Sequence, residues 1–358
     1  MSSPIRVLVA GCGNMGASHA RSYHKMPGFE IVGLVSRGPE SRNKLSEELG
    51  GYPTFGDYKE ALESTKPDAV SINTYPDTHA TYVKMALEAG AHIFVEKPLA
   101  ESVEEAEEIK ALAEKKGKKI VIGYILRVHP AWTKFIEIAQ GLGKPLVMRM
   151  NLNQQSFGDT WHTHKMLMQS MSPIVDCGVH YVDIMCLMTG ASPIRVSGIG
   201  ARLSEELVPN MYNYGQLQVT FDDGSVGWYE AGWGPMMSET AYFVKDVIGP
   251  KGCVSIVDRE GGERKGDSED IDSHTATNSL KIHYAETGSD GTFSKPDQWV
   301  DTTDEPDHQG LCDLEQAVFL KAIQENQDMS QHVQDAINSL KIVLAADESF
   351  KTGKTVEL

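Results

Sequence analysis

Three residues of types suited to acid–base chemistry lie in two short stretches of the sequence. Lys97 follows the apolar run Ile93-Phe94-Val95 and precedes a proline, while Asp176 and His180 stand four residues apart. A lysine at the carboxyl end of a buried strand can stabilise negative charge that develops on a substrate oxygen. On a helix, the spacing of Asp176 and His180 places a carboxylate beside an imidazole, which favours a general base. Taken singly, a surface lysine and a capping aspartate beside a half-buried histidine explain the same residues.

A glycine-rich sequence near the start of the chain indicates a dinucleotide site. Residues 5–10 read as a buried strand, the GxGxxG of residues 11–16 follows, and helical sequence continues to about residue 26. In this arrangement the first glycine permits a tight turn, the second lets a pyrophosphate approach, and the third lets helix and strand pack closely. The residues expected to bind the cofactor here are Gly11, Gly13, Asn14, Met15 and Gly16.

The residues after the second strand bear on the choice between NAD and NADP. An acidic residue that binds the ribose of NAD is expected about 20 residues past the glycines, but the sequence has Ser36 and Arg37 there. Ser36 can donate to a hydroxyl or a phosphate, and Arg37 can pair with a 2′-phosphate or stack on the adenine. A solvated loop charge is the plainer reading of Arg37. We expect either NAD or NADP to serve as cofactor.

The elements that must position these residues form two groups. Strands and helices alternate through residues 1–125, which predicts a Rossmann domain with a doubly wound parallel sheet. In residues 126–358, a helix (131–141), a strand (145–153), an irregular stretch (154–173) and an apolar helix carrying Asp176 come first. Six extended segments without intervening helices follow: 194–202, 215–221, 226–231, 242–247, 253–257 and 280–284.

This second pattern predicts an α+β domain with a large, open, mostly antiparallel sheet, so the fold class is α/β with an α+β C-terminal domain. Residues 259–278 read as a charged, glycine-rich surface loop. Helices are expected at 310–325 and at about 333–350, and the latter is able to pack back on the first domain. The helices are too few to cover both faces of the sheet, which predicts a homodimer or homotetramer.

Net charge and cysteine content limit the binding partners and metal sites that we expect. The net charge of −17 argues against nucleic acids and anionic membranes. The five cysteines are scattered without a CxxC pair, which suits a reducing cytoplasm and offers no zinc site. His162 and His164 have the spacing of metal ligands on a strand, but no carboxylate or cysteine lies near them in sequence. We therefore expect a cytoplasmic protein with no membrane partner and no metal.

Three motifs together resemble the Gfo/Idh/MocA family of sugar and cyclitol dehydrogenases, which includes the inositol dehydrogenases. They are the glycine motif, the run from Ala89 to Pro98 that ends in Glu-Lys-Pro, and Asp176-x-Gly-x-His180-x-x-Asp183. The resemblance covers essentially the whole chain. It implies that Lys97, Asp176 and His180 are the catalytic set and that the Lys97–Pro98 peptide is cis. It also implies further cofactor contacts at Thr74, Pro76, His79, Glu96 and Lys97.

The resemblance and the residues predict an NAD(P)-dependent oxidoreductase that oxidises a secondary hydroxyl of a cyclitol or monosaccharide, with an inositol favoured. His180 would take the proton, Lys97 would stabilise the oxygen, and Asp176 would orient both. An NAD-dependent glycosidase that uses transient oxidation and a redox-silent regulatory protein remain as alternatives. Besides the catalytic set, the candidate substrate contacts are Tyr124, Arg127, Trp161, His162, His164, Lys165, Tyr212, Trp233 and His308.

Overall fold

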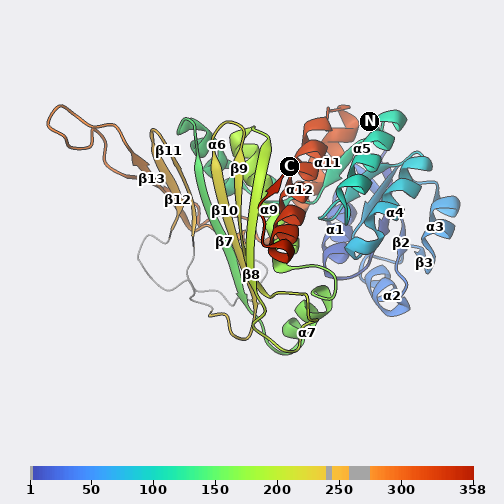
Figure 1. Ribbon diagram of the computed structural model, residues 1–358. Coiled ribbons are helices and arrows are strands. Elements are labelled where there is room, and N and C mark those ends of the chain that lie inside the picture. Colours follow the sequence, from blue (N-terminus) through green and yellow to red (C-terminus); the bar gives the residue numbers. More distant parts are fainter. Residues whose placement is uncertain (1–2, 239–243, 258–274) are drawn as a thin grey trace. The chain divides into compact units, whose positions relative to one another are not determined.

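The computed structural model describes residues 3–238, 244–257 and 275–358 (Figure 1). The chain forms two compact units. Unit 1 contains Met1–Ile125 and Asp307–Ile337, and unit 2 contains Leu126–Pro306 and Asn338–Leu358. Residues 307–337 therefore belong to unit 1, whereas the sequence analysis assigned all of 126–358 to the second domain. The loop expected at 259–278 lies, up to residue 274, outside the described residues.

Unit 1 is built on a six-stranded parallel sheet with the order β3-β2-β1-β4-β5-β6. Its strands are β1 (Ile5–Ala10), β2 (Phe29–Val35), β3 (Thr54–Phe55), β4 (Ala69–Ile72), β5 (His92–Val95) and β6 (Ile120–Ile122). The central strands are almost wholly buried, as a parallel sheet with helices on both faces requires. The strand order reverses between β1 and β4, and ligands bind beyond the carboxyl ends of strands at such a point.

The helices of unit 1 come from both ends of the chain. They are α1 (Asn14–Lys25), α2 (Pro39–Glu48), α3 (Tyr58–Thr65), α4 (Pro76–Glu88), α5 (Val103–Lys116), α11 (His308–Gln324) and the first residues of α12 (Ser330–Thr352). Helix α11 joins this unit because its Phe319 packs on Phe29 and Phe94, with ring centroids 6.0 and 6.1 Å apart. Burial of this apolar helix face explains why residues 307–337 belong to unit 1.

Unit 2 contains a nine-stranded sheet with the order β14-β13-β12-β11-β7-β10-β9-β8-β15. Its strands are β7 (Val147–Gln155), β8 (Pro193–Ala201), β9 (Tyr214–Phe221), β10 (Val226–Gly234), β11 (Lys245–Gly249), β12 (Gly252–Ile256), β13 (Ser279–Tyr284), β14 (Gln298–Asp301) and β15 (Val356–Glu357). All neighbours pair antiparallel except β7 and β10, which are parallel. The predicted α/β fold with a mostly antiparallel second sheet is confirmed.

Helices cover one face of this sheet (Figure 1). They are α6 (Pro130–Gly141), α8 (Pro173–Asp176), α9 (Gly178–Thr189) and the later part of α12, while α7 (Gly158–Leu167) follows β7 and a 3₁₀ turn, η1, spans Ile125–Arg127. Alternate residues of β9, Leu217, Val219 and Phe221, are buried, and of those between them Gln218 is exposed and Thr220 is partly exposed. In the described part of the chain, no helix is long and apolar enough to cross a membrane.

The structure differs from the sequence analysis in two places near the candidate site. The stretch expected to be irregular contains α7. The helix expected to carry both Asp176 and His180 is interrupted at Cys177, so Asp176 ends α8 and His180 lies in the first turn of α9. At this interruption the His180 N–H donates to the carbonyl of Cys177 at 3.2 Å, a bond between residues three apart.

Candidate functional site

The glycine motif forms the turn between β1 and α1, and its three glycines have different environments. Gly11 has a φ of +91°, and a Cβ there would lie 2.3 Å from the carbonyl oxygen of Asn73. A Cβ on Gly16 would lie 1.9 Å from the carbonyl oxygen of Gly11. A Cβ on Gly13 would meet nothing within 4 Å. Gly11 and Gly16 are therefore required by the protein's own packing, whereas the space at Gly13 is open.

This open space fits the phosphates of a dinucleotide. Gly13 is the N-cap of α1 and provides no side-chain cap, and the first turn of the helix carries no acidic residue. Its N–H groups and the positive end of the helix dipole are thus available for an anion. The residues of the motif fit the cofactor that the sequence predicts.

Two arginines lie close to the carboxyl end of β2, Arg37 in the loop that follows it and Arg42 on α2. Arg37 is exposed, as expected for a group that meets a cofactor or solvent. Arg42 on α2, which the sequence analysis missed, donates from Nη1 to the carbonyl oxygens of Ser36 and Arg37 at 2.5 and 3.1 Å. The Ser36 hydroxyl lies 3.3 Å from that of Ser41. Arg42 therefore holds the backbone of the loop that carries Arg37.

The loop after β4 contains Thr74, Pro76 and His79. Pro76 begins α4, and the hydroxyls of Thr74 and Thr78 are 2.6 Å apart. His79 is fully buried, with Nδ1 2.7 Å from the carbonyl oxygen of Pro98 and Nε2 3.0 Å from that of Thr74. Burial lowers the pKa of His79, although both carbonyls favour its charged form. His79 thus ties this loop to the peptide that follows Lys97.

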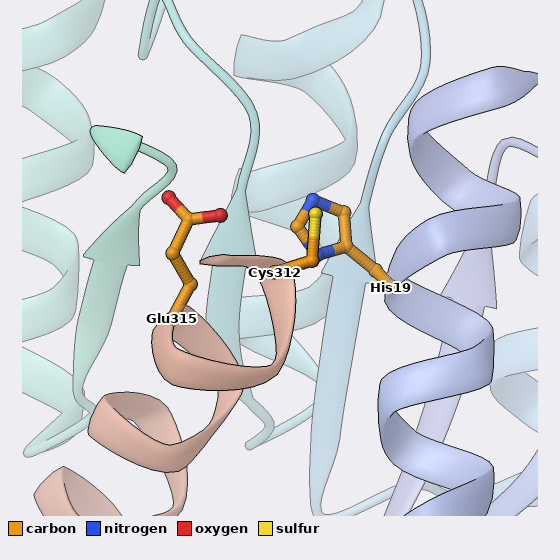
Figure 2. Close-up of side chains that lie close together, drawn as sticks. All are labelled: His19, Cys312 and Glu315. Carbon is orange, nitrogen blue, oxygen red and sulfur yellow. The ribbon is translucent and has the colours of Figure 1, made fainter. Parts of the chain in front are cut away.

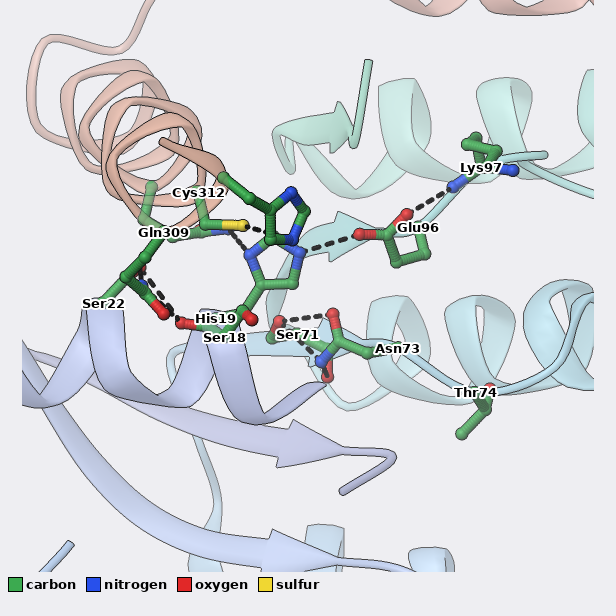
Figure 3. Close-up of polar contacts among 12 residues, drawn as sticks. Ser18, His19, Ser22, Ser71, Asn73, Thr74, Glu96, Lys97, Gln309 and Cys312 are labelled. Carbon is green, nitrogen blue, oxygen red and sulfur yellow. Dashed lines mark hydrogen bonds and ion pairs between the residues drawn. The ribbon is translucent and has the colours of Figure 1, made fainter. Parts of the chain in front are cut away.

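Lys97 stands where β5 ends, and its peptide bond to Pro98 is cis, as the resemblance implies. The preceding Glu96 is 8% exposed and accepts two hydrogen bonds (Figure 3). The His19 ring donates from Nε2 at 2.7 Å, and the Lys97 N–H approaches Oε2 at 3.3 Å. Glu96 therefore fixes the backbone at Lys97 from a buried position, and His19 is a residue that the sequence analysis did not single out.

Two residues of α11 lie beside this pair. Cys312, Glu315 and His19 have ligand-type atoms that all lie within 4.8 Å of one another (Figure 2). Glu315 is 3% exposed, and its pKa is raised well above its usual value by burial and by the negative charge of Glu96. Burial likewise raises the pKa of the Cys312 thiol. His19, Glu96, Cys312 and Glu315 thus form the buried polar centre of unit 1.

In unit 2, Asp176 and His180 flank the joint at Cys177. The Cys177 thiol lies 3.5 Å from the carboxylate of Asp176 and 3.6 Å from Oε1 of Gln154. A Cβ on Gly178 would lie 3.2 Å from the Tyr229 ring and 3.3 Å from Val343, so side chains of β10 and α12 approach this helix closely. The glycine between the two catalytic candidates is explained by packing.

A polar and aromatic layer lies next to this joint. Trp233 is buried and donates from Nε1 to Oε1 of Gln154 at 2.6 Å. The His164 ring stacks on Trp233 with centroids 4.2 Å apart, and its Nδ1 is 3.0 Å from the Ser156 hydroxyl. The structure therefore brings together Asp176, Cys177, Gln154, Trp233 and His164. Cys177, Gln154 and Ser156 belong to this layer and were not among the predicted site residues.

The other substrate candidates on α7 have their own partners. Trp161 donates to Glu206 at 3.3 Å, and the Lys165 ammonium pairs with the same carboxylate and lies 5.5 Å from the Trp161 ring centroid. His162 is exposed. Trp161, His164 and Lys165 share one helix face because they are three and four residues apart.

The remaining candidates are spread over both units. Arg127 forms a bidentate pair with the fully buried Asp183, with both distances 2.7 Å. The Tyr212 hydroxyl donates to Asp347. In unit 1, the buried Tyr124 faces the His332 ring, and His308 opens α11 with its ring 3.6 Å from the Cys312 sulfur.

Comparisons with known proteins agree with this architecture. Over 269 residues the chain is 29% identical to a scyllo-inositol 2-dehydrogenase (NAD(+)) of Bacillus subtilis, which covers 72% of this chain and 75% of the relative. A UDP-N-acetylglucosamine 3-dehydrogenase of Acidithiobacillus ferrooxidans is 29% identical over 198 residues, or 55% of this chain and 58% of the relative. Among solved structures, the scyllo-inositol dehydrogenase of Lactobacillus casei with NAD(H) and scyllo-inositol matches with a TM-score of 0.76 at 20% identity, over 99% of each chain.

Family descriptions account for both parts of the chain. Residues 5–124 match the oxidoreductase family with an NAD-binding Rossmann fold, GFO_IDH_MocA. Residues 137–358 match the C-terminal alpha/beta domain of the same family. The prediction of a Rossmann domain that binds NAD is thereby confirmed. The chain belongs to the Gfo/Idh/MocA family of oxidoreductases.

Proposed function

We propose that this protein is an NAD(P)-dependent dehydrogenase that oxidises a secondary hydroxyl of a cyclitol or monosaccharide, with an inositol as the favoured substrate. The observation that carries the proposal is the set of residues at the carboxyl edge of the parallel sheet. There, an open glycine turn at Gly13 and the buried support of Lys97 occur in one unit. The names of the relatives, which include inositol and sugar dehydrogenases, support the substrate class.

Each member of the proposed catalytic set has a distinct role. When bound, the nicotinamide supplies the hydride acceptor. His180 takes the proton of the substrate hydroxyl, and Lys97 donates to the same oxygen as negative charge develops on it. Asp176 orients the hydroxyl and the base.

The polar and aromatic layer of unit 2 suits a polyol. Hydroxyl groups need donors and acceptors held in fixed positions, with an apolar surface for the ring carbons. Trp233 and His164 form a stacked pair, and Gln154 is fixed by Trp233. We therefore place Trp233 and His164 among the substrate contacts, together with the α7 face that carries Trp161 and Lys165.

The test of this function uses the purified full-length chain with a panel of inositols, aldohexoses and simple glycosides, and with NAD and NADP. A dehydrogenase releases one reduced cofactor for each ketone formed. Cleavage of a glycoside without net reduction of the cofactor would establish the glycosidase alternative instead. Cofactor and sugar binding with no turnover on the whole panel would establish the redox-silent alternative.

The role of His180 is tested by His180→Ala. Loss of a positioned base lowers kcat by roughly two to four orders of magnitude. Cofactor affinity, measured by fluorescence titration, should be unchanged because the glycine turn is intact. His283→Ala is the matched control, since His283 pairs with Asp297 at a partly exposed site on β13 and belongs to no proposed role. Near-normal turnover in His180→Ala would remove His180 from the mechanism.

A further inference from the structure

The buried polar centre of unit 1 contains a carboxyl group that the proposed mechanism does not use. Glu315 is 3% exposed, and its Oε1 has no hydrogen-bond partner within the described residues. An ionised carboxylate in such a place is costly unless a cation or several donors compensate it. The protonation state of Glu315 therefore depends on what charge its neighbours carry.

The neighbouring imidazole has a hydrogen-bond partner at each of its ring nitrogens. The Tyr23 hydroxyl donates to Oε1 of Gln316 at 2.6 Å, which turns the amide nitrogen of Gln316 toward His19 Nδ1 at 2.9 Å. His19 Nε2 lies 2.7 Å from Oε1 of Glu96 (Figure 3). Both ring nitrogens of His19 are therefore engaged by groups other than Glu315.

The other titratable groups near Glu315 come from three elements, and the ring of His308 at the start of α11 lies 3.6 Å from the Cys312 sulfur. Helix α1 presents His19 and Tyr23, the end of β5 presents Glu96, and α11 itself presents Cys312. Burial and the charge of Glu96 both raise the pKa of Glu315. Burial raises the pKa values of Cys312 and Tyr23 as well, so both stay neutral at ordinary pH. Of the α11 carboxylates nearby, Asp313 accepts from Ser22 and Asp307 caps the helix.

We propose that Glu315 is a positioning residue that remains protonated, so that Glu96 is the one carboxylate of the cluster and keeps the backbone at Lys97 in a single geometry. The functional part of this inference rests on the proposed role of Lys97. If Glu315 ionised, two like charges would share a buried site, and Glu96 would be pushed from its bonds to His19 and to the Lys97 N–H. Lys97 would then move relative to the oxygen that it stabilises.

A metal ion is the other occupant that these side chains could hold. His19, Cys312 and Glu315 offer a nitrogen, a sulfur and an oxygen at close spacing (Figure 2). Both ring nitrogens of His19 are already engaged, however, by Glu96 and Gln316. A metal would have to displace one of these bonds. The hydrogen-bond pattern therefore favours the proton.

The first arm of the test measures stability and requires no activity. Because the pKa of Glu315 is raised in the folded state, the folded protein holds a proton that the unfolded chain releases above its own pKa of about 4.3. Stability from this group is complete below that value and is lost as pH rises toward the folded pKa. Glu315→Gln copies the protonated acid and has no such loss.

The experiment measures urea unfolding of both proteins between pH 5 and 8. The ratio of the folding equilibrium constant of Glu315→Gln to that of the wild type should increase with pH, by up to about tenfold per pH unit. A difference that is constant over this range would mean that Glu315 is ionised in the folded protein, and would overturn the proposal. This result does not depend on Lys97 being catalytic, so its failure is distinguishable from failure of the proposed function.

The second arm measures turnover and metal binding. Glu315→Ala, which removes the neutral acid and opens the cluster, should lower kcat by roughly tenfold with unchanged cofactor affinity, and Glu315→Gln should restore most of it. A Gln variant as slow as the Ala variant contradicts the neutral-acid role. Stoichiometric binding of Co²⁺ or Zn²⁺ to the wild type, abolished in Cys312→Ser, would show a metal site and also overturn the proposal.

Discussion

The glycine turn offers a sharp test because the same small change has opposite expected effects at two positions. At Gly13 the backbone has φ −78° and ψ −164°, which any residue adopts, and a Cβ meets nothing within 4 Å. Gly13→Ala should leave the cofactor-free protein folded and more stable by about 0.4–1 kcal/mol, because alanine restricts the unfolded chain. At Gly16 the added Cβ would lie 1.9 Å from a backbone oxygen. Gly16→Ala should therefore destabilise the protein by about 1–3 kcal/mol or more.

Cofactor affinity separates the two variants further. If the open space at Gly13 is where the pyrophosphate approaches, a methyl group there forces the phosphates outward. Crowding of this kind costs about 1–3 kcal/mol, or roughly 5- to 150-fold in Kd. The assay pairs urea unfolding of the cofactor-free proteins with calorimetric titration of NAD and NADP. Gly13→Ala that folds normally and binds both cofactors like the wild type would refute the assignment of this turn.

Two further predictions concern the cofactor and the assembly. Because Ser36 and Arg37 replace an acidic residue, we propose that the enzyme also accepts NADP, with charge-assisted contacts worth about 1.5–3 kcal/mol. Arg37→Ala should therefore lower kcat/KM for NADP but not for NAD. A wild type that favours NAD more than about a hundredfold, together with no selective loss for NADP in the variant, would contradict this prediction. Val226, Val147 and Ile248 pair across three strands and are 37–39% exposed on one face of the large sheet. If this face joins two copies of the chain, Val147→Glu should be monomeric by light scattering. Val208→Glu, which changes an exposed valine in a loop, is the control and should remain oligomeric. A wild type that is monomeric at micromolar concentration would contradict the prediction.

Local pattern was enough to predict most of unit 1. Its central strands are short apolar runs that are almost wholly buried, and several of its helices have a clear start signal, as at Ser102, whose hydroxyl accepts from the Glu105 N–H at 3.2 Å. The position of Lys97 follows from one such run, since a strand of a parallel sheet delivers its next residue to the ligand-binding edge. The break at Cys177 was not predictable in this way, because helical periodicity is the same on either side of a one-residue joint.

The residues that fix the backbone at Lys97 could not all be predicted from local sequence patterns. His19 and Gln316 are hydrogen-bonded although they are 297 residues apart. The pattern of α11 still contained a signal, because Glu315 and Gln316 fall on the stripe that buries Leu311, Phe319 and Ala322. Charged and amide side chains on an apolar stripe must find partners in the core. The sequence thus indicated that α11 carries buried polar groups, but only the packing of α11 on α1 identifies Tyr23 and His19 as the partners of Gln316.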